Sequence, residues 1–295
     1  MARRKLSIVL VIVLVALVAL AVQLDRTQFW EGRTAYAGWQ ARAHVIGGWC
    51  QLVDPTGAVQ YRGHGVECAA ELQRRRAEEG LRPASGHLVV LLHGMGRSPR
   101  LFGAMEPALR EAGYETIALA YPSLTRDIAG HARHLTAVLD GLQDVERVSF
   151  VTHSLGGIVL REAVAGDAAW RDRIALGRAV MLAPPNRGSA LAAALDDWAL
   201  FGAVGGPSAV QLADGDRFAA PPADFEIGVI AGGRGDDTGF NPALEGDNDG
   251  IVTVAETRLD AARDFLVVPA IHTFIADAPE TVAATLAFLE TGRFR

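Results

Sequence analysis

The strongest structural signal in this 295-residue chain is the run Arg147-Val148-Ser149-Phe150-Val151-Thr152-His153-Ser154-Leu155-Gly156-Gly157. Its first half is short, apolar and rich in β-branched residues, which predicts a buried strand. Residues 158–164 then have the composition of a helix. A strand that turns sharply into a helix with a serine at the corner is a nucleophile elbow, which exposes the serine hydroxyl. The alternative is an ordinary helix start with Ser154 as its N-cap.

Small residues two positions before and after the serine let the strand and the helix of an elbow pass close together. Gly156 supplies the second of these positions. The first is Thr152, where the G-x-S-x-G pattern has glycine. Threonine is still fairly small, so the departure from the pattern is mild.

Apolar strands alternate with helical segments on both sides of this run. We expect further strands at 88–92, 114–119, 178–182, 226–230 and 265–268, and helices at 99–111, 127–142 and 279–289. This alternation predicts a mostly parallel, doubly wound sheet. No glycine-rich dinucleotide fingerprint or P-loop follows any of the strands.

Length and charge limit the function classes. The chain is 50% hydrophobic, which is ample for one large α/β core. Its net charge is −6 and no basic stripe is present, so we expect no nucleic-acid partner.

The first 25 residues predict export. Residues 1–5 are basic, and the run 6–22 is almost wholly aliphatic. We favour an uncleaved signal anchor that forms a membrane helix over a signal peptide cleaved near Ala19-Leu20-Ala21. The basic end should stay in the cytoplasm, which places the rest of the chain in the periplasm or outside the cell. Cleavage would release a secreted protein.

Residues 26–86 form a second predicted unit. The turn Asp54-Pro55-Thr56-Gly57 separates two short strands, which predicts a β-hairpin at the start of the sheet, with a helix beginning near Glu67. Cys50 and Cys68 are the only cysteines, and in an exported chain we expect them to form a disulfide rather than two unrelated buried thiols. The aromatic residues at 30, 36 and 39 fit either a membrane interface or packing on the domain.

Several motifs along the chain together resemble the α/β-hydrolase family, in particular its lipases and esterases. The segments that match are 91–96 (an oxyanion loop), 152–157 (the elbow), 183–189 (a Pro-Asn-x-Gly-Ser turn), 246–252 (the acid-bearing turn) and 269–274 (the histidine loop). They occur in the order that this family uses. The resemblance covers residue 89 to the C-terminus and implies an α/β-hydrolase core at 87–295.

The resemblance implies a Ser-His-Asp triad. Ser154 is the nucleophile, and His272 is the base because it follows a late strand in the chain order Ser, Asp, His. Asp249 is the preferred acid, Asp247 is the second choice, and Asp236 and Asp237 are the third. The backbone N–H groups of Met95 and Leu155 are the expected oxyanion donors. His131 and His134 fall in a predicted helix and are expected at the surface.

Two further features leave alternatives open. The four aspartates just named could bind Ca²⁺, but their spacing matches no known loop, so no metal and no cofactor is assigned. Residues 184–224 form a long insertion with an apolar helical pattern at 191–201, which is either a lid over the acyl pocket or a passive packing helix.

We therefore expect a serine hydrolase that cleaves an acyl ester or a lipid through an acyl-enzyme intermediate. An acyltransferase with the same triad, or a hydrolase-fold protein that binds a ligand without turnover, are the alternatives.

Overall fold

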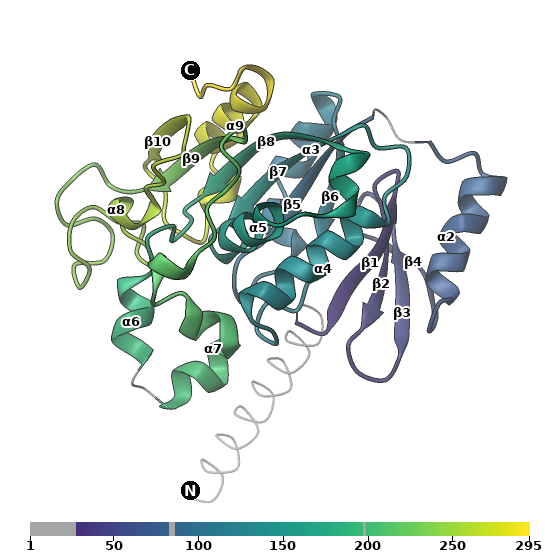
Figure 1. The fold of residues 1–295 in the computed structure, drawn as a ribbon, viewed down its shortest axis with the longest axis horizontal. Coiled ribbons are helices and arrows are strands. Elements are labelled where there is room, and N and C mark those ends of the chain that lie inside the picture. The colour runs from purple at the N-terminus through teal and green to yellow at the C-terminus, as the bar shows by residue number, and fades with distance from the viewer. Residues whose placement is uncertain (1–27, 83–85, 197–198) are drawn as a thin grey trace, which may run out of the picture.

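A computed structural model describes residues 28–82, 86–196 and 199–295 of the chain. Its centre is a parallel six-stranded sheet of order β10-β9-β8-β7-β5-β6 (Figure 1). The strands are β5 (His87–Leu92), β6 (Glu115–Leu119), β7 (Arg147–His153), β8 (Ala175–Leu182), β9 (Glu226–Gly232) and β10 (Asp264–Val268). Each lies within a few residues of a predicted strand, because continuous apolar runs are the pattern of a sheet buried on both faces.

Helices cover both faces of this sheet (Figure 1). Alternate residues of β5 face opposite ways, so Val90 packs with α4 (Ile128–Asp140) and α5 (Leu155–Ala165), while Leu91 packs with α3 (Met105–Glu111) and α9 (Pro279–Thr291). The shorter helices are η1 (Pro99–Phe102), η2 (Ala169–Asp172), η3 (Gly215–Arg217), α8 (Val254–Thr257) and η4 (Ile275–Asp277). The single helix predicted at 99–111 is thus divided into η1 and α3.

The strand order reverses direction between β5 and β7. From β5 the chain first adds β6 on one side, and it then returns to add β7, β8, β9 and β10 on the other. In open α/β sheets, ligands bind outside the carboxyl ends of the strands at such a switch point. The segment after β5 and Ser154 after β7 both lie at this point.

The N-terminal segment forms its own antiparallel sheet of order β1-β2-β3-β4, with α2 (Glu67–Glu78) packed against it (Figure 1). The strands are β1 (Trp30–Tyr36), β2 (Trp39–His44), β3 (Trp49–Val53) and β4 (Val59–His64). The predicted hairpin is present as β3 and β4, but it belongs to this separate sheet and not to the start of the large one. Cys50 on β3 and Cys68 on α2 form a disulfide with the two Cα atoms 5.9 Å apart.

The insertion after β8 contains α6 (Ala190–Asp196) and α7 (Ala199–Gln211). Gly206 interrupts α7 with φ 74°, and Pro207 follows it. Part of the apolar face predicted for this insertion, at residues 195–201, lies outside the described side chains.

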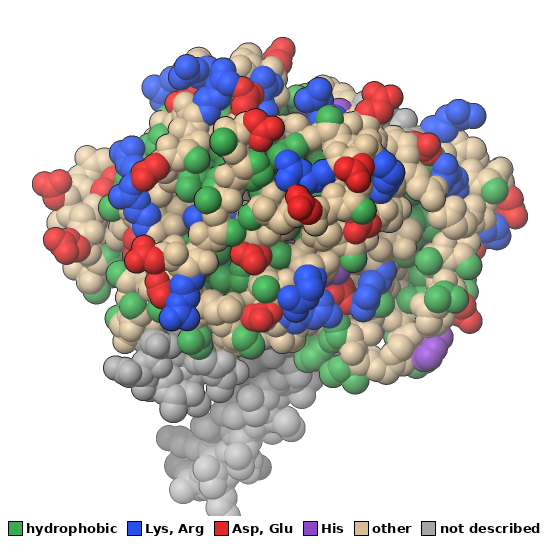
Figure 2. Space-filling view, viewed as in Figure 1, with side chains coloured by type: hydrophobic (Ala, Val, Ile, Leu, Met, Phe, Trp, Pro, Cys, Tyr) green, Lys and Arg blue, Asp and Glu red, His purple; other side chains and the backbone are tan. Residues whose placement is uncertain are grey.

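Within the three described ranges, no helix has the length and apolar character that a membrane span requires. The signal anchor predicted at residues 1–25 lies outside those ranges. On the face seen in Figure 2, basic and acidic side chains are interspersed and do not form one stripe of a single sign.

Candidate active site

Ser154 occupies a strained turn between β7 and α5. Its backbone has φ 52° and ψ −123°, a positive φ that is uncommon for a residue other than glycine. The Ser154 N–H donates to the Leu182 carbonyl of the neighbouring strand over 2.9 Å. A Cβ atom at Gly156 would lie 2.4 Å from the Leu92 carbonyl oxygen, so only glycine fits there. These are the backbone features of a nucleophile elbow and not of an ordinary N-cap.

Thr152 occupies the other small-residue position of the elbow. It fits there because the residue that faces it, Gly157, has no side chain. A Cβ atom at Gly157 would lie 3.3 Å from the Thr152 hydroxyl and 3.0 Å from Pro184 Cβ. The second glycine of the Gly156-Gly157 pair therefore leaves room for the threonine side chain, which is fully buried.

The loop after β5 approaches the elbow closely. A Cβ atom at Gly94 would lie 2.7 Å from His153 Nδ1 and 3.0 Å from Ser154 Cβ. Met95 follows and packs in one apolar cluster with Leu155. Leu155 is the first residue of α5, where backbone N–H groups have no partner within the helix. The loop that carries Met95 therefore lies beside the first turn of α5.

Residues that sequence analysis did not single out anchor this loop. The Tyr121 hydroxyl donates to the His93 carbonyl, and its ring stacks on the His93 ring at 4.3 Å between centroids. The Gly96 N–H donates to the Ser123 hydroxyl over 2.9 Å. Tyr121 and Ser123 follow β6, the strand beside β5, but nothing in their local sequence distinguishes them from ordinary loop residues.

Asp249 and His272 form a buried pair. His272 Nδ1 lies 2.6 Å from Asp249 Oδ2, and the His272 N–H donates to the Asp249 carbonyl over 2.9 Å. The other carboxylate oxygen, Oδ1, accepts the N–H groups of Ile251 and Val252 at 3.0 and 2.8 Å. Every Asp249 oxygen thus has a partner, and the carboxylate fixes the orientation and the tautomer of the His272 imidazole through its Nδ1 atom.

The aspartates that were the second and third choices for the acid make other contacts or are exposed. The Asp247 carboxylate accepts the N–H groups of Arg234 and Gly235 at 2.7 and 2.9 Å and closes the turn after β9. Asp236 accepts from the backbone of Thr238 and Gly239. Asp237 is exposed. Among the described residues, no set of three or more His, Cys, Asp or Glu side chains is grouped closely enough to hold a metal ion.

His153 links the elbow to the histidine loop. Its Nε2 lies 2.9 Å from the His272 carbonyl oxygen, so Nε2 carries the proton and donates it, and the two rings are 4.6 Å apart. Burial lowers the pKa of His153 well below its usual value, which keeps the ring neutral. Since His153 precedes Ser154 directly, this contact brings the serine and the Asp249–His272 pair to one end of the sheet. Both Ser154 and His272 retain some exposure, 9% and 7%.

The prediction for His131 and His134 was wrong. Both lie on the buried face of α4. His134 Nε2 lies 2.6 Å from the Gly32 carbonyl oxygen on β1, and His131 packs edge-on against Tyr121. Their burial depends on the N-terminal sheet and on the residues after β6, which the helix sequence alone does not reveal.

Apolar side chains are exposed around the histidine loop. Phe274, Ile271, Ile251 and Phe240 are 37–63% exposed. A groove of about 410 Å³ lies between Phe240 and Phe274. The inserted segment also lies near Ser154. Ala192 of α6 and Leu212 just after α7 pack in one apolar cluster with Leu155 and Ile158 of α5. The inserted segment therefore contacts the first turn of α5, next to Ser154.

Comparison with known families finds one match, which covers part of the chain. The family described as Domain of unknown function (DUF7379) matches residues 59–203. No curated protein matches the sequence.

Solved structures similar to this chain include lipases. The mature lipase BlEst2 of Bacillus licheniformis is 20% identical, with a TM-score of 0.54 over 70% of this chain and 91% of that chain. The lin2722 product of Listeria innocua is 18% identical, with a TM-score of 0.50 over 69% and 93%. The chain has the α/β-hydrolase fold of the lipases and esterases.

Proposed function

We propose that the chain is a serine ester hydrolase of the lipase and carboxylesterase type. The observation that carries the proposal is the buried His272–Asp249 pair at 2.6 Å, on a loop that His153 joins to the strained turn of Ser154. A serine hydroxyl becomes a useful nucleophile only when an adjacent base takes its proton. An aspartate at Nδ1 leaves the other imidazole nitrogen, Nε2, free to act as that base.

The proposed reaction has two steps. Ser154 Oγ attacks the ester carbonyl carbon while His272 takes its proton, and His272 then returns that proton to the departing alcohol. Water next attacks the acyl-enzyme and gives a proton to His272, which passes that proton to Ser154 Oγ as the acyl–serine bond breaks and the carboxylic acid leaves. The Met95 and Leu155 N–H groups would stabilise the oxyanion in both steps, each worth about 3–4 kcal/mol.

The exposed apolar side chains support an ester with an apolar acyl group. Ile271 and Phe274 flank His272, so a hydrocarbon chain next to the reacting carbonyl would remove them from water. Graded p-nitrophenyl esters test this point. We expect kcat/KM to rise with acyl length beyond acetate, and a preference for acetate would contradict an apolar acyl site.

Labelling by a fluorophosphonate probe tests whether Ser154 is nucleophilic. We expect the unsubstituted protein to be labelled and to hydrolyse p-nitrophenyl esters, whereas Ser154→Ala should lose labelling and lower kcat by on the order of 10⁴-fold or more. Ser149→Ala is the matched control, since Ser149 lies on β7, the strand that leads into the elbow, and its hydroxyl accepts the Arg178 N–H. Unchanged turnover in folded Ser154→Ala would refute the mechanism, and a protein that is never labelled would favour ligand binding without catalysis.

We also propose that the catalytic domain lies outside the cytoplasm, held by residues 1–25. The basic start and aliphatic run of the sequence support this location, and so does the Cys50–Cys68 disulfide, because disulfides persist in oxidising compartments. An alkaline carbonate wash should leave the protein in the membrane fraction. A protein recovered from the cytoplasm with two free thiols would contradict the proposal.

A further inference from the structure

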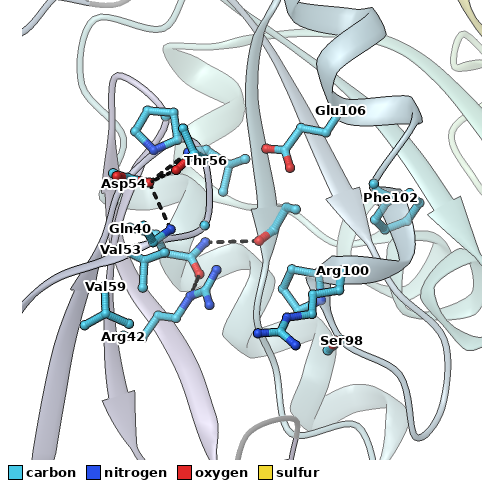
Figure 3. Close-up of a pocket in the computed structure, with 18 of the residues that line it drawn as sticks. Gln40, Arg42, Val53, Asp54, Thr56, Val59, Ser98, Arg100, Phe102 and Glu106 are labelled. Carbon is cyan, nitrogen blue, oxygen red and sulfur yellow. Dashed lines mark hydrogen bonds between the residues drawn. The ribbon is translucent and has the colours of Figure 1, made fainter.

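A cavity separates the N-terminal sheet from the large domain. It measures about 770 Å³ and lies between one face of β2 and β3 and the wall made by η1, α3 and β6 (Figure 3). This volume is in the range of sites that hold small organic ligands. None of Ser154, Asp249 or His272 lines it. The cavity is therefore separate from the candidate active site.

Two arginines extend toward one another from opposite walls of this cavity (Figure 3). Arg42 comes from β2 and Arg100 from η1. Arg42 donates through Nε to the Gln40 side chain, which leaves the outer nitrogens of its guanidinium directed into the cavity. Across the described ranges, no carboxylate forms an ion pair with Arg42 or Arg100 within 4.0 Å.

Burial makes this arrangement costly without a ligand. It lowers the pKa of Arg42 to about 10; the negative charge of Glu106 opposes this shift, and the positive charge of Arg100 adds to it. Arg42 still carries its charge at neutral pH. Two positive charges that share a partly dehydrated cavity, and that have no ion pair with a described carboxylate, favour an anion between them.

The acids of the cavity are already engaged. The Glu106 carboxylate pairs with Arg110 at 3.0 Å and accepts the Thr116 hydroxyl at 3.2 Å. Asp54 accepts the backbone N–H groups of Thr56 and Ala58, together with two side-chain donors, in its own turn. The charge of Glu106 acts on Arg42 from a distance, but neither carboxylate forms an ion pair with Arg42 or Arg100 in the described ranges.

We infer that this cavity binds a phosphate monoester, with its phosphate between Arg42 and Arg100. A phosphate monoester carries about −1.5 to −2 charges at neutral pH, which balances both arginines, whereas a carboxylate balances only one. The planar fork of each guanidinium matches phosphate oxygens in a bidentate manner. Val53, Phe102 and Ile117 are among the other residues that line the cavity and offer apolar contacts to the organic part of the ligand. This inference does not rest on the proposed hydrolase activity.

Isothermal titration of the full chain in non-ionic detergent, at constant ionic strength, tests the site. The probes are glycerol 3-phosphate and monomeric dihexanoyl phosphatidic acid, with sodium acetate and dihexanoyl phosphatidylcholine as comparison ligands. We expect saturable one-to-one binding of at least one phosphate monoester and none of the comparison ligands. Binding of both monoesters indicates a soluble phosphate ester, and binding of phosphatidic acid alone indicates a lipid headgroup.

Variants locate the binding. Arg100 is exposed, so Arg100→Gln should fold normally and weaken binding about tenfold, the loss expected for one charged hydrogen-bond partner. Arg42→Lys keeps the charge but loses the fork, and it should weaken binding as well. Arg217→Gln removes the same charge at an exposed site outside the cavity and should bind like the unsubstituted protein. No saturable binding of either monoester, or equal weakening by Arg100→Gln and Arg217→Gln, would overturn the inference.

Discussion

Two histidines packed behind the oxyanion loop should make the stability of the protein depend on pH. His93 and His131 are almost completely buried, and their rings contact Tyr121 at 4.3 and 5.0 Å between centroids. Burial lowers the pKa of each imidazole to about 4. In the unfolded chain the same side chains have a pKa of about 6.5.

The sign of the effect follows from which state binds more protons. Between pH 6.5 and 4 the unfolded chain is protonated at these positions and the folded protein is not. The free energy of unfolding therefore falls as the pH falls through 6.5, and it has its full value above that pH. The two pKa values give a loss of about 2 kcal/mol per histidine between pH 7 and pH 5.

Urea denaturation at pH 7, 6 and 5 measures this loss. His131→Leu removes one of the two titrating groups. Between pH 7 and pH 5, the free energy of unfolding of this variant should therefore fall by about 2 kcal/mol less than that of the unsubstituted protein. His64→Leu is the control because His64 is exposed on β4, and it should follow the unsubstituted protein. An equal loss of stability in His131→Leu and the unsubstituted protein would contradict a neutral, buried His131.

Two other predictions concern the acid and the disulfide. Asp249→Asn should lower kcat by about 10⁴-fold, because the amide favours the wrong tautomer of His272. Asp247→Asn should mainly disturb the turn after β9. The kinetics of p-nitrophenyl ester hydrolysis measure both effects, and a larger kcat loss in Asp247→Asn would reverse the assignment of the acid. Replacing Cys50 and Cys68 by serine opens a loop with a sequence separation of 18 and should lower the free energy of unfolding by about 3 kcal/mol; an unchanged urea midpoint would contradict this.

The sequence predicted the features that depend on local backbone chemistry. The strands of the large sheet are continuous apolar runs, and the elbow requires a glycine where Gly156 meets the Leu92 carbonyl. Thr152 stands where the elbow pattern has glycine, and this departure also has a local explanation, because Gly157 leaves room for the threonine side chain. Asp249 could be preferred over Asp247 on its Ile251-Val252 context, but only the fold shows which carboxylate reaches His272.

Features that depend on distant contacts were not predictable in this way. Strands β1 and β2 carry few long aliphatic side chains, so their pattern did not suggest a sheet. His131 and His134 become buried only because Tyr121 and β1 cover α4. The cavity between Arg42 and Arg100 joins two segments separated by more than fifty residues, and neither segment has a recognisable motif.

The N-terminal sheet covers an edge of the large sheet. β6 is an edge strand, and an uncovered sheet edge is open to pairing with another chain. The Gly32 N–H donates to the Ala120 carbonyl over 2.8 Å, and the Gln40 side chain contacts the backbone of Ala118 and Ala120. A Cβ atom at Gly32 would lie 2.7 Å from Leu119 Cδ1, so β1 packs closely against the end of β6 at this point. Since Gln40 also orients Arg42, the contacts that cover this edge hold the wall of the anion cavity in place.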